Sequence, residues 1–113
     1  NCALIAGCSI TVGRDCLIAG RVRISDQDGH PLDAERRRAG EPTPAECIKP
    51  VVVGNDVWIG EGAVILKGVQ IGDRAIVGAR AVVTKAVSAD TVVAGNPART
   101  VKSLPGDRVP SAA

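Results

Sequence analysis

Hydrophobic and polar positions recur every six residues between Val53 and Val87. The first position of each unit is Ile or Val, and the fifth is Val or Ala. The period differs from that of an amphipathic helix, whose apolar face recurs at three and four residues, and from the simple alternation of a strand. It predicts one short strand and one tight turn per unit. The six units are 53–58, 59–64, 65–70, 71–76, 77–82 and 83–88.

Three such units predict one flat-sided coil, in which residues 18 apart stack on successive coils. Branched side chains then form inward ladders between parallel strands about 4.8 Å apart. The small fifth position avoids overpacking where three inner walls meet, and we expect glycine at the second position to supply the positive φ of a corner. Short repeats of this kind are typical of parallel β-helices. The predicted stacked pairs are Val53 with Ile71, Ile59 with Val77, and Ile65 with Val83.

The 113 residues predict a single all-β domain with four segments. Residues 1–25 form the first coils, with poorer units at Val12, Ile18 and Ile24; 26–50 form a long polar excursion loop; 51–88 form the main coils; and 89–113 form a C-terminal strand, turn and tail. In the last segment we expect a strand through 92–93, a turn at 95–97, then a short helix and a frayed tail from 105. The sequence starts at Asn1, which suggests an excised domain or missing preceding residues.

Composition narrows the class of protein. Trp58 is the only aromatic residue, so the core must consist of Val, Ile and Ala ladders. A net charge of +2 with interspersed signs argues against nucleic-acid binding. The four cysteines form no C-x-x-C pair, which predicts buried thiols in a reducing compartment and no metal site. No signal peptide or membrane-length apolar run is visible, so we expect a cytoplasmic protein without a membrane span.

His30 is the only histidine and lies in the excursion loop. A lone loop histidine is often a bystander, but imidazole is the usual general base near neutral pH, and Asp26, Asp28 and Glu41 in the same loop are candidates to orient it. A single histidine excludes a three-histidine zinc site. No nucleophile elbow is present, which favours direct attack of an acceptor on an activated acyl group.

Other candidate binding residues have plainer alternatives. Trp58 stands at an outward position and is either a binding-surface residue or a harmless surface aromatic. The run Arg36 to Arg38 is a solvated helical face or a phosphate contact. Arg99 and Lys102 are candidates to clamp phosphates through charge-assisted hydrogen bonds.

Several motifs together resemble one family. The chain from about Thr11 to Leu104 closely resembles the maltose and galactoside O-acetyltransferase group of the hexapeptide-repeat acyltransferases. The combination is specific, whereas the repeats alone would not be. The motifs are Gly29-His30-Pro31-Leu32-Asp33, Glu35-Arg36-Arg37 with Gly40, Lys49-Pro50, the run from Gly54 to Gly60, and the run from Val92 to Arg99.

The resemblance implies a left-handed parallel β-helix, an exception to the right-handed crossover rule. It also implies a homotrimer that binds acetyl-CoA in clefts between subunits, without a metal. The family's catalytic histidine matches His30. Acetyl-CoA contacts fall on the Ala79 backbone, Thr84, Lys85, Arg99 and Lys102, and the family tryptophan that lines the site matches Trp58.

The chain also departs from the family pattern. Lys102 stands where many relatives have arginine, and Glu61 where a relative has a serine that contacts the cofactor. The excursion loop is longer, and the amino-terminal helical segment that supplies acceptor contacts is missing.

The sequence therefore predicts an acetyl-CoA-dependent O-acetyltransferase that acts on a hydroxyl of a sugar or glycan-type acceptor, with His30 as general base in a ternary complex. Two alternatives remain open: an N-acetyltransferase acting on an amino sugar or nucleotide sugar, and a non-catalytic trimeric β-helix module.

Overall fold

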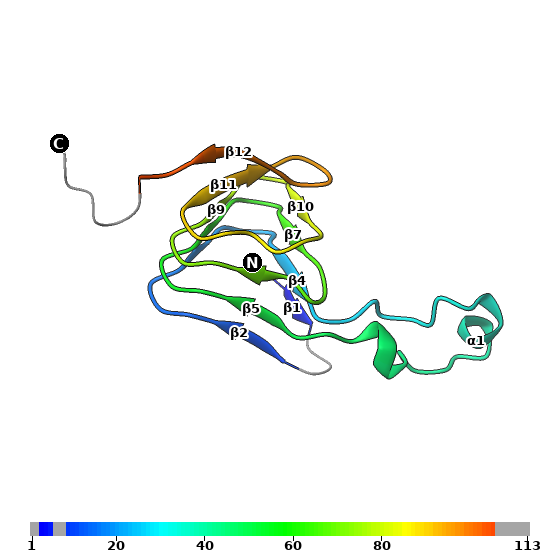
Figure 1. Cartoon of the computed structure of the whole chain (residues 1–113). Coiled ribbons are helices and arrows are strands. Elements are labelled where there is room, and N and C mark those ends of the chain that lie inside the picture. The colour runs from blue at the N-terminus through cyan, green and yellow to red at the C-terminus, as the bar shows by residue number, and fades with distance from the viewer. Residues whose placement is uncertain (1–2, 6–8, 106–113) are drawn as a thin grey trace.

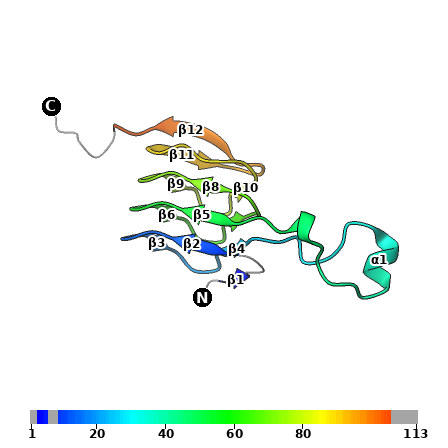
Figure 2. The ribbon, with the colours of Figure 1, turned by 60° about the horizontal axis from the view of Figure 1, so that its bottom comes forward.

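The chain winds into a stack of flat triangular coils with one long arm (Figures 1 and 2). The computed structural model describes residues 3–5 and 9–105. Between β4 (Arg23–Ser25) and β5 (Val51–Val53) the arm carries a short α-helix, α1 (Ala34–Arg38), and a 3₁₀ turn, η1 (Ala45–Cys47). The strands are β1 (Ala3–Ile5), β2 (Ile10–Val12), β3 (Leu17–Ile18), β4 (Arg23–Ser25), β5 (Val51–Val53), β6 (Trp58–Ile59), β7 (Val64–Ile65), β8 (Gln70–Ile71), β9 (Ile76–Val77), β10 (Val82–Val83), β11 (Thr91–Ala94) and β12 (Arg99–Ser103).

The strands form three sheets, one on each side of the triangle. We name them side A (β1-β4-β7-β10), side B (β2-β5-β8) and side C (β3-β6-β9-β11-β12). Every pairing is parallel except the one between β11 and β12. The register confirms the predicted stacking, because Val53 pairs with Ile71, Ile59 with Val77, and Ile65 with Val83.

The core is the aliphatic ladder that the repeat predicts. First-position and fifth-position side chains of the main coils point inward and are at most 6% exposed. The units at Val12, Ile18 and Ile24 lie in phase beneath Val53, Ile59 and Ile65, so the arm interrupts the chain without disturbing the stack. The buried ladder residues of the main coils are Val53, Val57, Ile59, Ala63, Ile65, Val69, Ile71, Ala75, Val77, Ala81, Val83 and Val87.

The glycines at the second position have a different role from the one predicted. Positive φ falls at the fourth position of the units, for example at Asp56, Gly62 and Arg74. The second-position glycines are needed because the next coil lies directly against them. A Cβ on Gly60 would meet the backbone nitrogen of Ala79 at 2.7 Å, closer than coils at parallel-strand spacing can accommodate.

The C-terminal segment confirms one expectation and corrects another. Strand β11 contains Val92 and Val93, and the turn at 95–97 is present. The predicted short helix after this turn is wrong, since Arg99–Ser103 forms strand β12 and pairs with β11 as an antiparallel hairpin. Strand β12 thereby supplies hydrogen-bond partners to the edge of β11 at the end of the stack. The predicted tail lies outside the described residues, apart from Pro105.

Candidate active site

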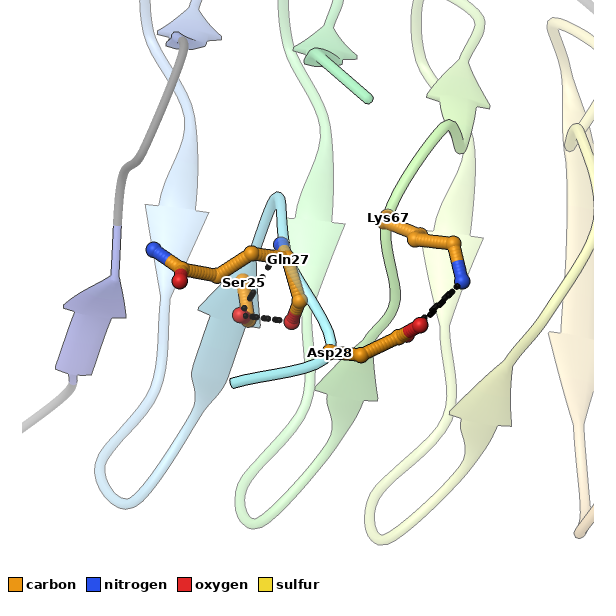
Figure 3. Close-up of polar contacts among 4 residues, drawn as sticks. All are labelled: Ser25, Gln27, Asp28 and Lys67. Atoms are coloured by element: carbon orange, nitrogen blue, oxygen red, sulfur yellow. Dashed lines mark hydrogen bonds and ion pairs between the residues drawn. The ribbon is translucent and has the colours of Figure 1, made fainter. Parts of the chain in front are cut away.

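The arm that carries His30 leaves the stack at the corner between sides A and B. Ser25, the last residue of β4, turns the chain outward: its hydroxyl donates to the Gln27 carbonyl at 2.8 Å and accepts from the Gln27 amide at 3.3 Å (Figure 3). Gln27 then forms an isolated antiparallel β-bridge with Ile48. The Asp28 amide donates to the Cys47 carbonyl at 3.0 Å, and the Lys49 amide donates to the Asp26 carbonyl at 2.7 Å. The two legs of the arm are thus paired at their base.

An ion pair joins the outgoing leg to the coil. Lys67 Nζ lies 2.7 Å from Asp28 Oδ1 and 2.8 Å from Oδ2, and both side chains are about one quarter exposed (Figure 3). The Lys67 ammonium holds the pKa of the Asp28 carboxyl below its ordinary value. Burial, and then the hydrogen bond with Asp28, raises the pKa of the Cys47 thiol. Asp28 is therefore a carboxylate at neutral pH, and Cys47 is a thiol.

The end of the arm is held by its own contacts. Asp33 caps α1 by accepting from the Glu35 amide at 3.0 Å. Arg36 Nε lies 2.9 Å from Glu41 Oε1, and Arg37 donates to the carbonyls of Pro31 and Leu32. The predicted helical turn at 36–38 is confirmed, and two of its arginines, Arg36 and Arg37, bind groups of the arm itself.

His30 is exposed and follows Gly29, whose φ of 92° turns the backbone after Asp28. Within the part of the chain that the structure describes, the imidazole has no hydrogen bond or ion pair. Of the three carboxylates considered as its orienting partner, Asp28 binds Lys67 and Glu41 binds Arg36. Asp26 is fully buried at the base of the arm.

The candidate phosphate ligands gather at the last coil. Lys85 and Arg99 line one pocket of about 230 Å³ between the end of β10 and the β11–β12 hairpin. Strand β12 has an irregular register, in which Val92 pairs with Lys102 and Val93 with Thr100, so that Val101 is extra. The extra residue interrupts the alternation of side chains and places Arg99 and Lys102 on the same face, although they are three positions apart.

Trp58 lies on the outer face of side C, where its side chain is 51% exposed. The pairings align Leu17, Trp58, Ile76 and Val92 in one outward row. Lys102 continues this row, because it pairs with Val92. An apolar strip with cations at its end is suited to an elongated ligand that has an apolar part and phosphate groups.

The other predicted cofactor residues lie at corners. Ala79 follows β9 at the corner between sides C and A, directly over Gly60. Thr84 is exposed after β10, beside Lys85. The structure thus brings Lys85 and Arg99 to one pocket, and Trp58, Arg99 and Lys102 to one face. The arm that carries His30 departs from the corner between sides A and B, opposite the face that carries Trp58, Arg99 and Lys102. Thr84 and Lys85 lie at this same corner on the last coil, and no hydrogen bond or ion pair among the described residues joins His30 to them.

Lys67 is the residue that sequence reasoning missed. Its third position in the unit that starts at Ile65 predicts an outward side chain at a corner, but not a partner 39 residues away. The repeat resumes in phase after the arm, so Ile65 stacks on Ile24. This stacking, which places the corner at Lys67 above the point where the arm departs, is the one sequence feature that points to the contact.

Residues 3–5 and 9–105 contain no helix long and apolar enough to cross a bilayer. Among the same residues, no group of three His, Cys, Asp or Glu side chains is arranged to hold a metal ion. Cys16 is half-buried and Cys47 is buried, both as free thiols, while Cys2 and Cys8 lie outside the described ranges.

Comparison with known proteins gave consistent matches. Residues 50–85 match the family model "Bacterial transferase hexapeptide (six repeats)". Galactoside O-acetyltransferase of Escherichia coli (strain K12) is 38% identical over 104 residues, which are 92% of this chain and 49% of that protein. The chain therefore spans about half the length of this relative.

Solved structures share the fold. A galactoside acetyltransferase in complex with coenzyme A superposes with a TM-score of 0.82 at 38% identity, over 96% of this chain and 51% of that one. A hexapeptide-repeat-containing acetyltransferase of Vibrio cholerae gives a TM-score of 0.66 at 31% identity, over 90% of this chain and 70% of that one. The fold is the left-handed parallel β-helix of these proteins.

Proposed function

The chain belongs to the hexapeptide-repeat acyltransferases, and on that premise we propose that it transfers an acetyl group from acetyl-CoA to a hydroxyl of a sugar or glycan-type acceptor. The observation that carries the proposal is the match of nearly the whole chain to a galactoside acetyltransferase that binds coenzyme A. The exposed histidine on the arm and the cations on the last coil supply the two kinds of group that such a reaction needs.

Acetyl-CoA fits the face of side C by its chemistry. The proposed phosphate ligands are Arg99 and Lys102 on this face, together with Lys85, which shares a pocket with Arg99 at the end of the stack. Each charge-assisted hydrogen bond would contribute about 1.5 to 3 kcal/mol. Trp58 and its apolar neighbours offer a surface for the pantetheine part. From Trp58 to Lys102 the row crosses three strand spacings, or about 14 Å. Thr84 and the Ala79 backbone complete the proposed cofactor contacts.

His30 is the proposed general base. When bound, acetyl-CoA supplies a thioester whose carbonyl carbon accepts the attacking oxygen. An imidazole nitrogen of His30 would remove the proton from the acceptor hydroxyl as that oxygen attacks. The carbon–sulfur bond of the thioester would then break, CoA would leave as the thiolate, and the protonated imidazole would return the proton to it. General-base assistance of this kind contributes about 10² to 10⁴ in rate, and alignment of the reacting atoms supplies further acceleration.

The position of the arm supports a site shared between subunits. It leaves at the corner between sides A and B, whereas Trp58, Arg99 and Lys102 lie on side C. In Figures 1 and 2 the arm extends away from the stack that carries it. We propose a homotrimer in which the arm of one protomer reaches the cofactor face of the next.

Product chemistry tests the proposal. The protein is incubated with acetyl-CoA and a panel of sugars, oligosaccharides and amino sugars, and free CoA thiol is measured. Acetylated products are then treated with alkaline hydroxylamine, which cleaves an O-acetyl ester but leaves an N-acetyl amide. Hydroxylamine-labile product supports O-transfer, and hydroxylamine-stable product supports the N-acetyltransferase alternative. Failure to bind CoA supports the non-catalytic module.

A further inference from the structure

Both legs of the arm are fastened to the same corner of the main coils. This corner comprises residues 66–69, between β7 and β8. The Gly68 amide donates to the Lys49 carbonyl of the returning leg at 3.2 Å. Lys67 binds both carboxylate oxygens of Asp28 on the outgoing leg. One contact therefore uses the backbone, and the other depends entirely on two side chains.

The side-chain contact is the one nearest to His30. Asp28 precedes it by two residues, with Gly29 between them. Gly29 has open space around its Cα, since a Cβ there would meet nothing within 4 Å. Because Gly29 has no packing contact of its own, the backbone that enters His30 from this side is held in place at Asp28, by Lys67 and by the hydrogen bond from the Asp28 amide to the Cys47 carbonyl.

We propose that Lys67 and Asp28 are positioning residues, which fix the outgoing leg of the arm and so direct His30 toward the acceptor. The inference rests on the proposed role of His30 as general base. Asp28 acts through Lys67 and the backbone rather than through contact with the imidazole, because both of its oxygens face the ammonium group.

The proposal predicts an effect on turnover rather than on cofactor affinity. Partly exposed ion pairs add little to global stability, but a displacement of about 1 Å at a catalytic group can lower the rate about a hundredfold. In Lys67→Met, which keeps the alkyl stem, we expect kcat to fall about tenfold to a hundredfold with an unchanged KM for acetyl-CoA. Asp28→Asn should behave alike, the double variant should lose no more than either single one, and Lys67→Arg should retain the rate.

A matched control removes a comparable ion pair elsewhere. Arg74 Nε lies 2.7 Å from Asp90 Oδ1 on coils away from the arm. Asp90→Asn should leave kcat unchanged. A loss in Asp90→Asn as large as that in Lys67→Met would mean that both variants act through general stability, and would overturn the positioning role.

The His30→Ala background separates positioning from other effects. If Lys67 acts through His30, Lys67→Met should lower the rate of the wild-type protein but not the residual rate of His30→Ala. An equal loss in both backgrounds, or a wild-type rate in Lys67→Met, would overturn the inference while leaving the O-acetyltransferase proposal intact. An unchanged rate in His30→Ala would instead refute the proposed base.

A measurement without turnover tests the same claim. His30 is the only histidine of this sequence, so its imidazole NMR signal can be identified by its loss in His30→Ala. We expect a single narrow signal in the starting protein and in Asp90→Asn, and a shifted or broadened signal in Lys67→Met. Identical His30 signals in the starting protein and Lys67→Met would contradict the proposal, whatever the activity.

Discussion

Lys67 and Asp28 are 39 residues apart in sequence, and their side chains meet at 2.7 Å between Nζ and Oδ1. The contact joins the repetitive coils to the arm, which has no repeat. Lys67 belongs to a coil whose shape repeats every six residues, whereas Asp28 belongs to an arm without a repeat. The arm carries the proposed base, and the coils carry the proposed cofactor ligands. The contact therefore fixes the start of the arm relative to the coils.

The lowered pKa of Asp28 predicts the pH dependence of this contact. A carboxyl whose pKa is lower in the folded protein stabilises the fold above its unfolded pKa of about 3.9, and that stabilisation is lost as the pH falls through the folded value. At pH 7, Asp28→Asn should lower the melting temperature by a few degrees at most, since such pairs contribute about 1 kcal/mol or less. Thermal melts between pH 7 and pH 2 should show the difference shrinking below about pH 4. A difference that grows at low pH would contradict this assignment.

The close contact between coils predicts a strong effect at Gly60. Gly60→Ala places a Cβ 2.7 Å from the Ala79 nitrogen and 3.0 Å from the Ala79 Cα. We expect a loss of about 1 to 3 kcal/mol in the free energy of unfolding, the usual cost of overpacking. Denaturant unfolding measures it. Gly20→Ala is the matched control, because a Cβ there meets nothing within 4 Å. Equal stability of the two variants would refute the packing explanation.

The repeat predicts most of the fold because it is encoded in local chemistry. Inward ladders follow from Ile, Val and Ala at fixed positions, and the stacked pairs follow from three units per coil. The role of the second-position glycines was misassigned, since a one-dimensional pattern does not show that the next coil lies 2.7 Å from a Cβ at Gly60. The helix expected after the turn is a strand, because the open edge of β11 provides hydrogen-bond partners that outweigh local preference.

The site was less predictable than the fold. The sequence marks His30, Arg99 and Lys102 by residue type, but the face shared by the last two depends on the extra residue Val101 in β12. The partner of Asp28 depends on how the arm folds back over the corner at Lys67, and no period describes the arm. Contacts of this kind are set by tertiary packing, so neither composition nor spacing predicts them.

The cations on β12 predict a specific effect on cofactor binding. Arg99→Gln and Lys102→Gln should each raise the dissociation constant for acetyl-CoA about tenfold to a hundredfold, the equivalent of losing one charge-assisted contact. Calorimetric titration measures it. Arg23→Gln is the control, because Arg23 is an exposed arginine on side A. Unchanged affinity in both β12 variants would exclude these residues as phosphate ligands.

Trp58 provides a direct optical test of the cofactor face. It is the only tryptophan and is half-exposed, so the protein's tryptophan emission reports on this one position. Addition of CoA should change the intensity or wavelength of the emission, with a midpoint equal to the calorimetric dissociation constant. Emission that stays constant while calorimetry detects binding would place the cofactor away from Trp58.

The central claim is that His30 is the general base for acetyl transfer. The most direct measurement is the rate of thiol release from acetyl-CoA by the starting protein and by His30→Ala, with both substrates saturating and the acceptor chosen from the active panel. We predict that kcat falls about a hundredfold or more, while the dissociation constant for CoA is unchanged. Equal rates in the two proteins would contradict the account.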